Sequence, residues 1–341
     1  MRLRRLISLA ITALAIAWGC DVHEFPTENQ YIDVTLNVTF DDNLALYREI
    51  DYVTKADPKE RQMRHTIEAY YATGPATWAE EPDFRTTVYT DGPQDVTVNL
   101  KLEPARYRLM VWSDYTDLQG SSLYYDPTDF NEIRIPDTEY VGSDPYRDVF
   151  AGVKEVDYTK ILEADAHVDE TLTMSRPVGK YSIVATDRDD FLKMYVARLR
   201  ERMIRNGIDT KGQEPRVEDI NIDIFKVVVA YTGFLPDTYS LWRERPTDAR
   251  TGVQFESRLR EMDGGDLELA LDYVIVNGEE SAVAVGMFIY DDYNEILATI
   301  QTNIPLHAGM RTTLKGKFLT SGAASGISIQ PGYDGEFNIP L

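Results

Sequence analysis

The chain has 341 residues, of which 43% are hydrophobic and 27% charged, with 35 Lys and Arg against 57 Asp and Glu. This length suffices for about two domains with buried cores. The formal charge of −22 argues against nucleic acid and anionic lipid headgroups as partners. One Cys rules out an intrachain disulfide, and with only four His the sequence offers no Cys-rich or His-rich metal cluster.

Residues 1–19 are predicted to be a lipoprotein signal peptide. Basic residues precede an apolar run over 6–18, which is short for a membrane span, and the small residue Gly19 stands before Cys20, the only Cys of the chain. A bacterial lipobox places at this position the thiol that receives diacylglycerol. An uncleaved anchor or a plain secretory signal is the alternative. Lipidation of Cys20 would hold the protein on a membrane, with the polar residues 20–30 as tether.

Beyond the tether, hydrophobicity alternates with a period of two. Ile32, Val34 and Leu36 begin an apolar face that continues to Phe40, with polar residues between them, which is typical of a half-buried strand. Similar strands are predicted over 64–71, 84–90, 95–102, 106–112, 131–135, 148–156 and 167–174. Since turn residues and no helix separate them, residues 31–175 are predicted to form an antiparallel β-sandwich domain.

A second domain is predicted over residues 176–341. Its strands are expected over 180–187, 220–234, 266–276, 281–291, 295–306 and 310–320. A helix is predicted at about 189–206, with Asp187 or Asp189 as its N-cap and Gly207 at its end. Asn277 and Gly278 favour a two-residue hairpin turn. The predicted fold class is therefore all-β and mainly antiparallel, with two tandem sandwiches and one helix in the second.

Several phrases of the sequence resemble a known family. They are CDVHEFP after the signal peptide, SRPVGKYSIVATD, YTGFLPDTYSL and IPLHAGMRTTLKGKFLT. Together they look like an uncharacterised Bacteroidales lipoprotein family that is similar to fimbrillin-type proteins, whose anchor and accessory subunits have two transthyretin-like β-sandwiches. Fimbrillin subunits assemble by strand exchange after a protease cuts behind an Arg. The resemblance implies residues 31–40 as the exchangeable strand and Arg48, Arg61 or Arg64 as candidate processing sites.

A cluster of aromatic and acidic residues is the candidate binding surface for a glycan or a partner. It contains Trp112, Tyr115, Tyr124, Tyr125 and Asp126. Aromatic faces stack on sugar rings and carboxylates accept hydroxyl hydrogen bonds. The alternative is that the rings pack in the core and the Asp residues form turns.

Catalytic and metal chemistry receive little support. The sequence has no nucleophile elbow, no phosphate-binding glycine loop and no zinc-protease helix motif. No catalytic residue and no metal ligand is predicted, a structural cation in the acidic loops has no positive support, and the only predicted attached group is the diacylglycerol on Cys20.

The predicted function is that of a non-enzymatic lipoprotein of the outer membrane or cell surface. The resemblance implies a fimbrillin-like anchor, accessory or adhesion subunit that acts by lipid anchoring, strand-edge pairing and loop contacts. Its expected partners are the membrane, through the lipid, and fimbrial or surface proteins or glycans. The alternative is a carbohydrate-binding lipoprotein of a polysaccharide-uptake system. Exposed rings over residues 115–130 would favour the glycan role, whereas buried rings beside an open sheet edge would favour assembly.

Overall fold

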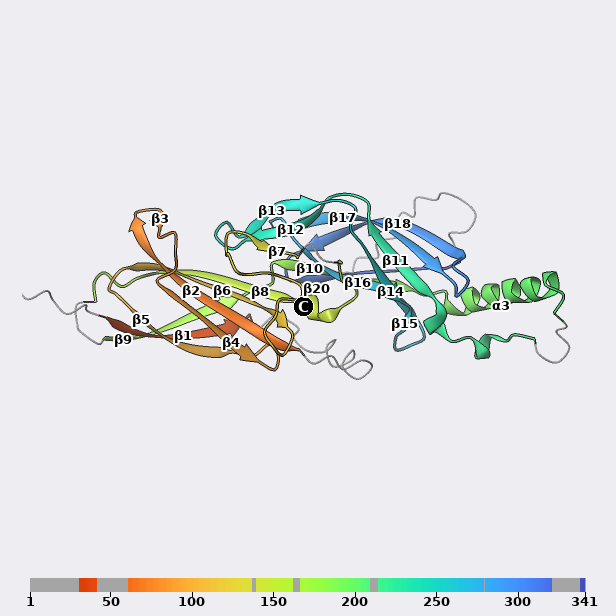
Figure 1. Ribbon diagram of the computed structural model, residues 1–341, viewed down its shortest axis with the longest axis horizontal. Helices are drawn as coiled ribbons and strands as arrows, with labels where there is room; N and C mark the ends of the chain where they lie inside the picture. Colours follow the sequence, from red (N-terminus) through yellow and green to blue (C-terminus); the bar gives the residue numbers. More distant parts are fainter. Residues whose placement is uncertain are drawn as a thin grey trace, which may run out of the picture.

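The computed structural model describes residues 31–41, 61–136, 139–161, 166–208, 214–278 and 280–320, and the backbone of 338–340. These residues form two β-rich halves that lie end to end, with a helix projecting from the far end of the second half (Figure 1). The prediction of a mainly β fold with antiparallel sandwiches and one helix is confirmed. Within the described part of the chain, no helix is long and apolar enough to cross a membrane.

The N-terminal half is a sandwich of two sheets, one in the order β5-β1-β9 and the other in the order β4-β2-β6-β8, with β3 attached to β2. The strands are β1 (Ile32–Phe40), β2 (Gln62–Gly74), β3 (Thr77–Trp78), β4 (Phe84–Thr90), β5 (Val96–Leu102), β6 (Arg106–Thr116), β8 (Val149–Asp157) and β9 (Ala166–Met174). Contacts between the sheets include Phe40 of β1 against Phe150 of β8, with ring centroids 4.7 Å apart. The sandwich core therefore lies between these two sheets.

Strand β1 is the middle strand of its sheet. It pairs antiparallel with β5 and parallel with β9. The apolar side chains of this strand are buried, as the alternation predicts: Ile32, Val34, Leu36, Val38 and Phe40. The polar residues between them are exposed or partly exposed. Strands β2 and β6 lack such alternation because both of their faces are covered: Met63–Tyr70 and Tyr107 with Leu109–Thr116 are buried.

The C-terminal half also has two sheets, in the orders β15-β16-β10-β19-β20 and β14-β11-β17-β18. The strands are β10 (Val178–Ala185), β11 (Lys226–Tyr231), β14 (Gln254–Arg258), β15 (Arg260–Glu261), β16 (Leu267–Ile275), β17 (Glu280–Tyr290), β18 (Ile296–His307), β19 (Met310–Gly316) and β20 (Asn338–Pro340). Most pairs are antiparallel, but β10 and β19 are parallel.

A third, small sheet links the halves. It has the order β13-β12-β7, with β7 (Ile133–Arg134), β12 (Leu235–Ser240) and β13 (Arg245–Arg250). The strand predicted over 131–135 is thus only two residues long, and it pairs with the C-terminal half rather than with its own sandwich. The short 3-10 helices are η1 (Pro145–Arg147), η2 (Val217–Asp219) and η3 (Ile222–Ile224).

Helix α3 (Arg188–Arg205) follows the prediction, and Gly207 ends it in the left-handed conformation with φ of 68°. Asp187 stands at the N-cap, but its carboxylate does not bond the helix. It accepts hydrogen bonds from the backbone N–H groups of Leu319 and Thr320, at 3.1 and 2.8 Å. The carboxylate is therefore used to hold the segment after β19 against the start of the helix.

The hairpin predicted at Asn277 and Gly278 is wrong. Strand β16, before this turn, pairs with β10 and β15, whereas β17, after it, pairs with β11 and β18. Gly278 does adopt a turn conformation, with φ of 77°. The chain crosses here from one sheet to the other.

Candidate functional site

The predicted aromatic cluster does not form an open platform. Trp112, Tyr115, Tyr124 and Tyr125 are all at most 4% exposed. Asp126 is the exposed member, and its carboxylate accepts hydrogen bonds from the N–H and hydroxyl of Thr128 in a tight turn. In this conformation the four rings offer no face on which a sugar could stack, and Asp126 has the role of a turn former.

The C-terminal half covers Trp112. The Trp112 ring lies between Tyr125 and Tyr239 of β12, with centroids 5.7 and 5.8 Å away. Nearby, Trp242 packs edge-on against Tyr70 of β2, with centroids 4.6 Å apart. The outer face of the β2-β6 sheet is therefore an interface between the two halves rather than a solvated surface.

At the centre of this interface lies a polar cluster, here called the joint, made of Tyr140, Arg147, Tyr181, Tyr231 and Asp272. The Arg147 Nε and Asp272 Oδ1 are 2.9 Å apart, and both side chains are at most 1% exposed. Tyr140 and Tyr231 donate hydroxyl hydrogen bonds to Asp272 Oδ2, at 2.7 and 2.6 Å. Arg147 also lies over the Tyr140 ring, 4.2 Å from its centroid. Because Arg147 and Tyr140 come from the N-terminal half and Asp272 and Tyr231 from the C-terminal half, these contacts fasten the two halves.

The electrostatics of the joint favour a structural role. Burial raises the pKa of Asp272, and Arg147 and the two hydroxyl donors only partly offset this. Burial would by itself lower the pKa of Arg147, but Tyr140 and Asp272 outweigh it and raise the pKa. Burial also raises the pKa of Tyr140 and Tyr231 well above the usual range. These phenols are neutral and out of contact with solvent, so the cluster presents no accessible base or nucleophile.

The candidate processing sites fall in three environments. Arg48 lies outside the described residues. Arg61 directly precedes β2 and is half-buried. Arg64 lies inside β2, where its Nε and Nη2 donate to both carboxylate oxygens of the buried Asp114, at 2.9 and 2.8 Å. A protease needs an accessible extended backbone, so the central position of Arg64 in a sheet shields its peptide bond.

Cys20 also lies outside the described residues, so its lipidation stays a prediction. Among the described residues, no group of three or more His, Cys, Asp or Glu side chains is arranged to hold a metal ion.

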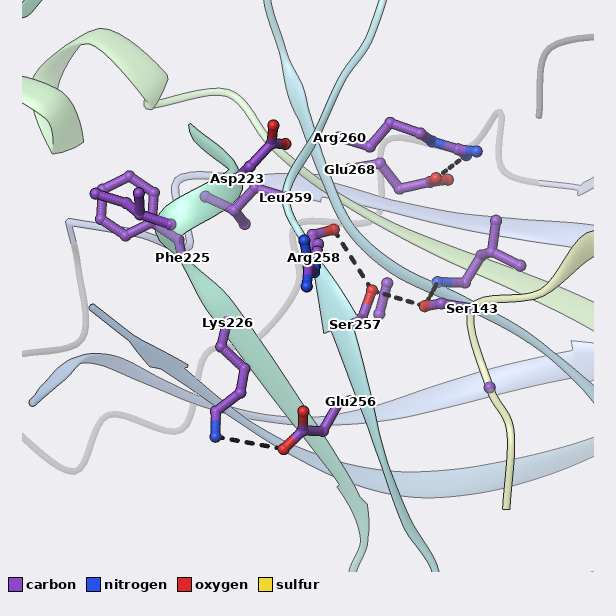
Figure 2. Close-up of a pocket in the computed structure, with 14 residues that line it drawn as sticks. Ser143, Asp223, Phe225, Lys226, Glu256, Ser257, Arg258, Leu259, Arg260 and Glu268 are labelled. Carbon is purple, nitrogen blue, oxygen red and sulfur yellow. Dashed lines mark hydrogen bonds and ion pairs between the residues drawn. The ribbon is translucent and has the colours of Figure 1, made fainter. Parts of the chain in front are cut away.

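One hollow surface, here called the groove, opens at the side of the C-terminal sandwich between β14 and β16 (Figure 2). Its volume is about 670 Å³. Its apolar floor includes Phe225, Leu259 and Ala270. Charged side chains form its rim: Asp223, Lys226, Glu256, Arg258, Arg260 and Glu268. Lys226 pairs with Glu256 at 3.3 Å, and Arg260 pairs with Glu268.

The segment before β8 occupies one end of the groove. The Ser143 N–H donates to the Leu271 carbonyl oxygen at 2.9 Å, and the Ser143 hydroxyl bonds that of Ser257 at 2.8 Å. Gly142 lies under the ring of Phe255, where a Cβ would come within 2.5 Å of ring atoms. Any larger residue at this position would have to displace the ring.

Sequence reasoning missed the joint and the groove. One signal for the joint was present: Asp272 lies in the mostly apolar strand β16, and a carboxylate in a buried strand requires a partner. Its partners could not be named, because Tyr140 and Arg147 lie more than a hundred residues away along the chain.

Comparison with protein families decides the family. Residues 26–341 match a family of unknown function, DUF6562. The chain belongs to the DUF6562 family. None of the curated proteins compared with this family member matches it.

Several solved structures are similar to this DUF6562 chain. A candidate cell adhesion protein from Bacteroides eggerthii has a TM-score of 0.43 and 10% identity, with 86% of this chain and 89% of that chain covered. The fimbrial anchor protein Mfa2 from Porphyromonas gingivalis has a TM-score of 0.40 and 7% sequence identity, with 80% of this chain and 82% of that chain covered. A candidate polysaccharide-binding protein from Bacteroides thetaiotaomicron has a TM-score of 0.38 and 7% sequence identity, with 80% of each chain covered. At these identities the likeness concerns the fold alone.

Proposed function

We propose that this DUF6562 chain is a non-enzymatic lipoprotein of the cell surface that serves as an anchor, accessory or adhesion subunit of a fimbrial type of assembly. Lipid on Cys20 attaches it to the outer membrane. Its sheet edges and loops contact a fimbrial or other surface protein.

The observation that carries the proposal is the joint. Two sandwiches that are fastened through a fully buried ion pair form one elongated body (Figure 1). Such a body transmits a load from a partner to its tether without a flexible hinge. An enzyme would need an accessible cleft with convergent titratable groups, whereas the buried titratable groups of the joint hold the two halves together.

The position of β1 supports an anchor that keeps its first strand. The strand begins at Ile32, about ten residues after Cys20, and it is inserted between β5 and β9. Its five inward side chains are at most 8% exposed. The burial of Trp112, Tyr124 and Tyr125 favours this assembly role over the carbohydrate-binding alternative, which needs open rings.

The test is the Cys20→Ala variant. We expect the wild type in the membrane fraction, with an N-terminal mass increased by acyl chains, and the variant in the soluble fraction, because the lipid supplies the membrane contact. The matched control is Met63→Leu, a conservative change in the N-terminal core, which should leave fractionation unchanged. Membrane association of Cys20→Ala, or an unmodified thiol in the wild type, would refute the anchor.

A further inference from the structure

Helix α3 has no role in the anchoring described above. It has 18 residues and is roughly 27 Å long at ~1.5 Å per residue. Its buried side chains all lie in its first half: Phe191, Leu192, Tyr195 and Val196. From residue 197 onward no residue of the helix is buried, and this half projects beyond the sandwich (Figure 1). Residues 197–208 are here called the tip.

The tip is held in one conformation by contacts at its base and at its end. Arg202 forms ion pairs with Asp291 and Glu295, at 3.3 and 2.7 Å. The helix ends in a hydrogen-bonded C-terminal motif, in which the Ile208 N–H donates to the Met203 carbonyl oxygen at 3.0 Å. The side chains of the tip are therefore presented by an ordered helix end.

The tip exposes large apolar side chains. Ile204 is 70% exposed, and Ile208, directly after the helix, is 51% exposed. Among the described large hydrophobic residues, only Phe234 is more exposed than Ile204. The solvated face of a helix usually carries polar side chains, so isoleucine at this position favours a surface that a partner covers.

The tip is also basic, although the chain as a whole carries a formal charge of −22. Residues 197–208 contain four Arg and one Glu. Arg200 pairs with Glu214 at 3.7 Å, whereas Arg198 and Arg205 form no salt bridge with another residue that the structure describes. The helix dipole favours cations at this end, which accounts for the arginines but not for the exposed isoleucines. Together they form a surface that is complementary to carboxylates beside an apolar pocket.

The tip lies at the end of the molecule that is remote from the tether. Strand β1 begins at Ile32, at the end of the N-terminal sandwich where β5 ends and β9 begins. At the other end of β1, Phe40 pairs with Met174, which is followed by β10 of the C-terminal half. Helix α3 projects from the opposite end of that half (Figure 1). A protein held by lipid on Cys20 therefore directs the tip away from the membrane.

We propose that the tip binds an acidic groove of a partner protein, with Ile204 in an apolar pocket and Arg198 and Arg205 on carboxylates. This is helix-in-groove recognition, in which an exposed helix face supplies the anchor residues. The direction of the tip argues against the anchoring membrane as its occupant, and the charge of −22 on each copy argues against a second copy of this chain. The inference deepens the proposed function by naming its partner surface, and it rests on that function only for the direction in which the tip points.

The first test is photo-crosslinking in intact cells that produce the full chain. The variant Ile204→p-benzoylphenylalanine carries the probe on the tip. The matched control, Tyr71→p-benzoylphenylalanine, carries it on a residue that is 43% exposed in the N-terminal half. We expect an adduct with a different protein from the tip and not from the control, and mass spectrometry should locate the adduct in a segment that contains Asp or Glu.

The second test measures binding of the captured protein, after purification, to the full chain in detergent. Ile204→Asp and Arg205→Glu should each raise the Kd at least tenfold, by calorimetry. Arg245→Glu, an exposed charge reversal in β13, should leave the Kd unchanged. Thermal unfolding of each variant shows whether it is folded.

Four outcomes would overturn the proposal. They are no adduct at the tip beyond that of the control, an adduct with lipid or lipopolysaccharide, an adduct with a second copy of the chain, and a Kd that Arg205→Glu leaves unchanged. Because membrane release of Cys20→Ala is measured separately, failure of the tip and failure of the anchor are distinguishable.

Discussion

One segment of the chain, residues 140–147, contributes to both the joint and the groove, yet the two sites differ in solvent exposure and in the pairing of their charges. Between Tyr140 and Arg147 this segment runs from the groove, where Gly142 and Ser143 touch β14 and β16, into the joint, where Arg147 meets Asp272. The joint is dry and its charges are matched with each other. The groove is open, and Arg258 at its rim forms no salt bridge with another residue that the structure describes.

This difference teaches how burial separates structural from interaction roles. An ion pair in a dry site cannot be broken without a large cost, so it is suited to permanent fastening. Ion pairs at an exposed rim are weak and exchangeable, so they leave room for a partner. Three predictions test this contrast.

The largest effect is expected for Asp272→Ala. The variant leaves Arg147 as an uncompensated buried charge and removes the acceptor of two tyrosine hydroxyls. We expect the free energy of unfolding to fall by about 3–5 kcal/mol, measured by urea denaturation. The double variant Arg147→Met with Asp272→Leu should recover most of this loss, because it removes both charges. A loss below ~1 kcal/mol for Asp272→Ala would show that the joint is not the fastening.

The second prediction concerns the stability of the protein at acid pH. It extends the comparison to a buried group inside the N-terminal sandwich. His65 of β2 is fully buried, and its ring nitrogens bond Ser113 and Thr90 at 2.8 and 3.0 Å. Burial lowers the pKa of His65 to about 4. The unfolded chain binds a proton below about pH 6.5 and the folded chain does not, so stability falls as the pH drops from 6.5 to 4.

The measurement compares wild type with His65→Gln across that range. The free energy of unfolding of the wild type should fall by about 3 kcal/mol more than that of the variant, because the pKa of His65 falls from 6.5 in the unfolded chain to about 4 in the folded chain. Asp114, whose pKa burial raises to about 6, acts in the opposite direction but is present in both proteins, so it cancels from the difference. Parallel stability curves for the two proteins would show that His65 does not titrate as its burial implies.

The smallest effect is expected at the groove. Lys226 and Glu256 are 39% and 66% exposed, so Lys226→Ala removes a solvated ion pair. The free energy of unfolding should change by less than about 1 kcal/mol in urea denaturation. A loss above ~2 kcal/mol would place the rim of the groove among the structural contacts and remove its contrast with the joint.

Period-two alternation predicted the half-buried strands well, because one face of β1 and β5 meets the core and the other meets water. The short strands β12 to β14 were not predicted from the sequence. Polar residues such as Asp237, Asp248 and Glu256 interrupt their hydrophobic alternation. The wrong hairpin at Asn277 and Gly278 has a different cause: local turn chemistry specifies a reversal of the chain but not which sheet receives the next strand.

The candidate site was harder to predict than the fold. The composition of the aromatic cluster suits a sugar surface and a buried interface equally, and the placement of Tyr239 over Trp112 distinguishes the two. That placement depends on contacts between residues more than a hundred positions apart, which periodicity does not encode.

The parallel pairing of β1 with β9 sets the order in which the chain can fold. Thr39 and its neighbour Thr173 are 134 residues apart, so the strand that is synthesised first must wait for β9 before its sheet closes. Closing so large a loop is slow, and during this delay the apolar edge of the nascent chain is vulnerable to aggregation. A cell that makes this protein therefore needs to shield β1 until residue 174 has been synthesised.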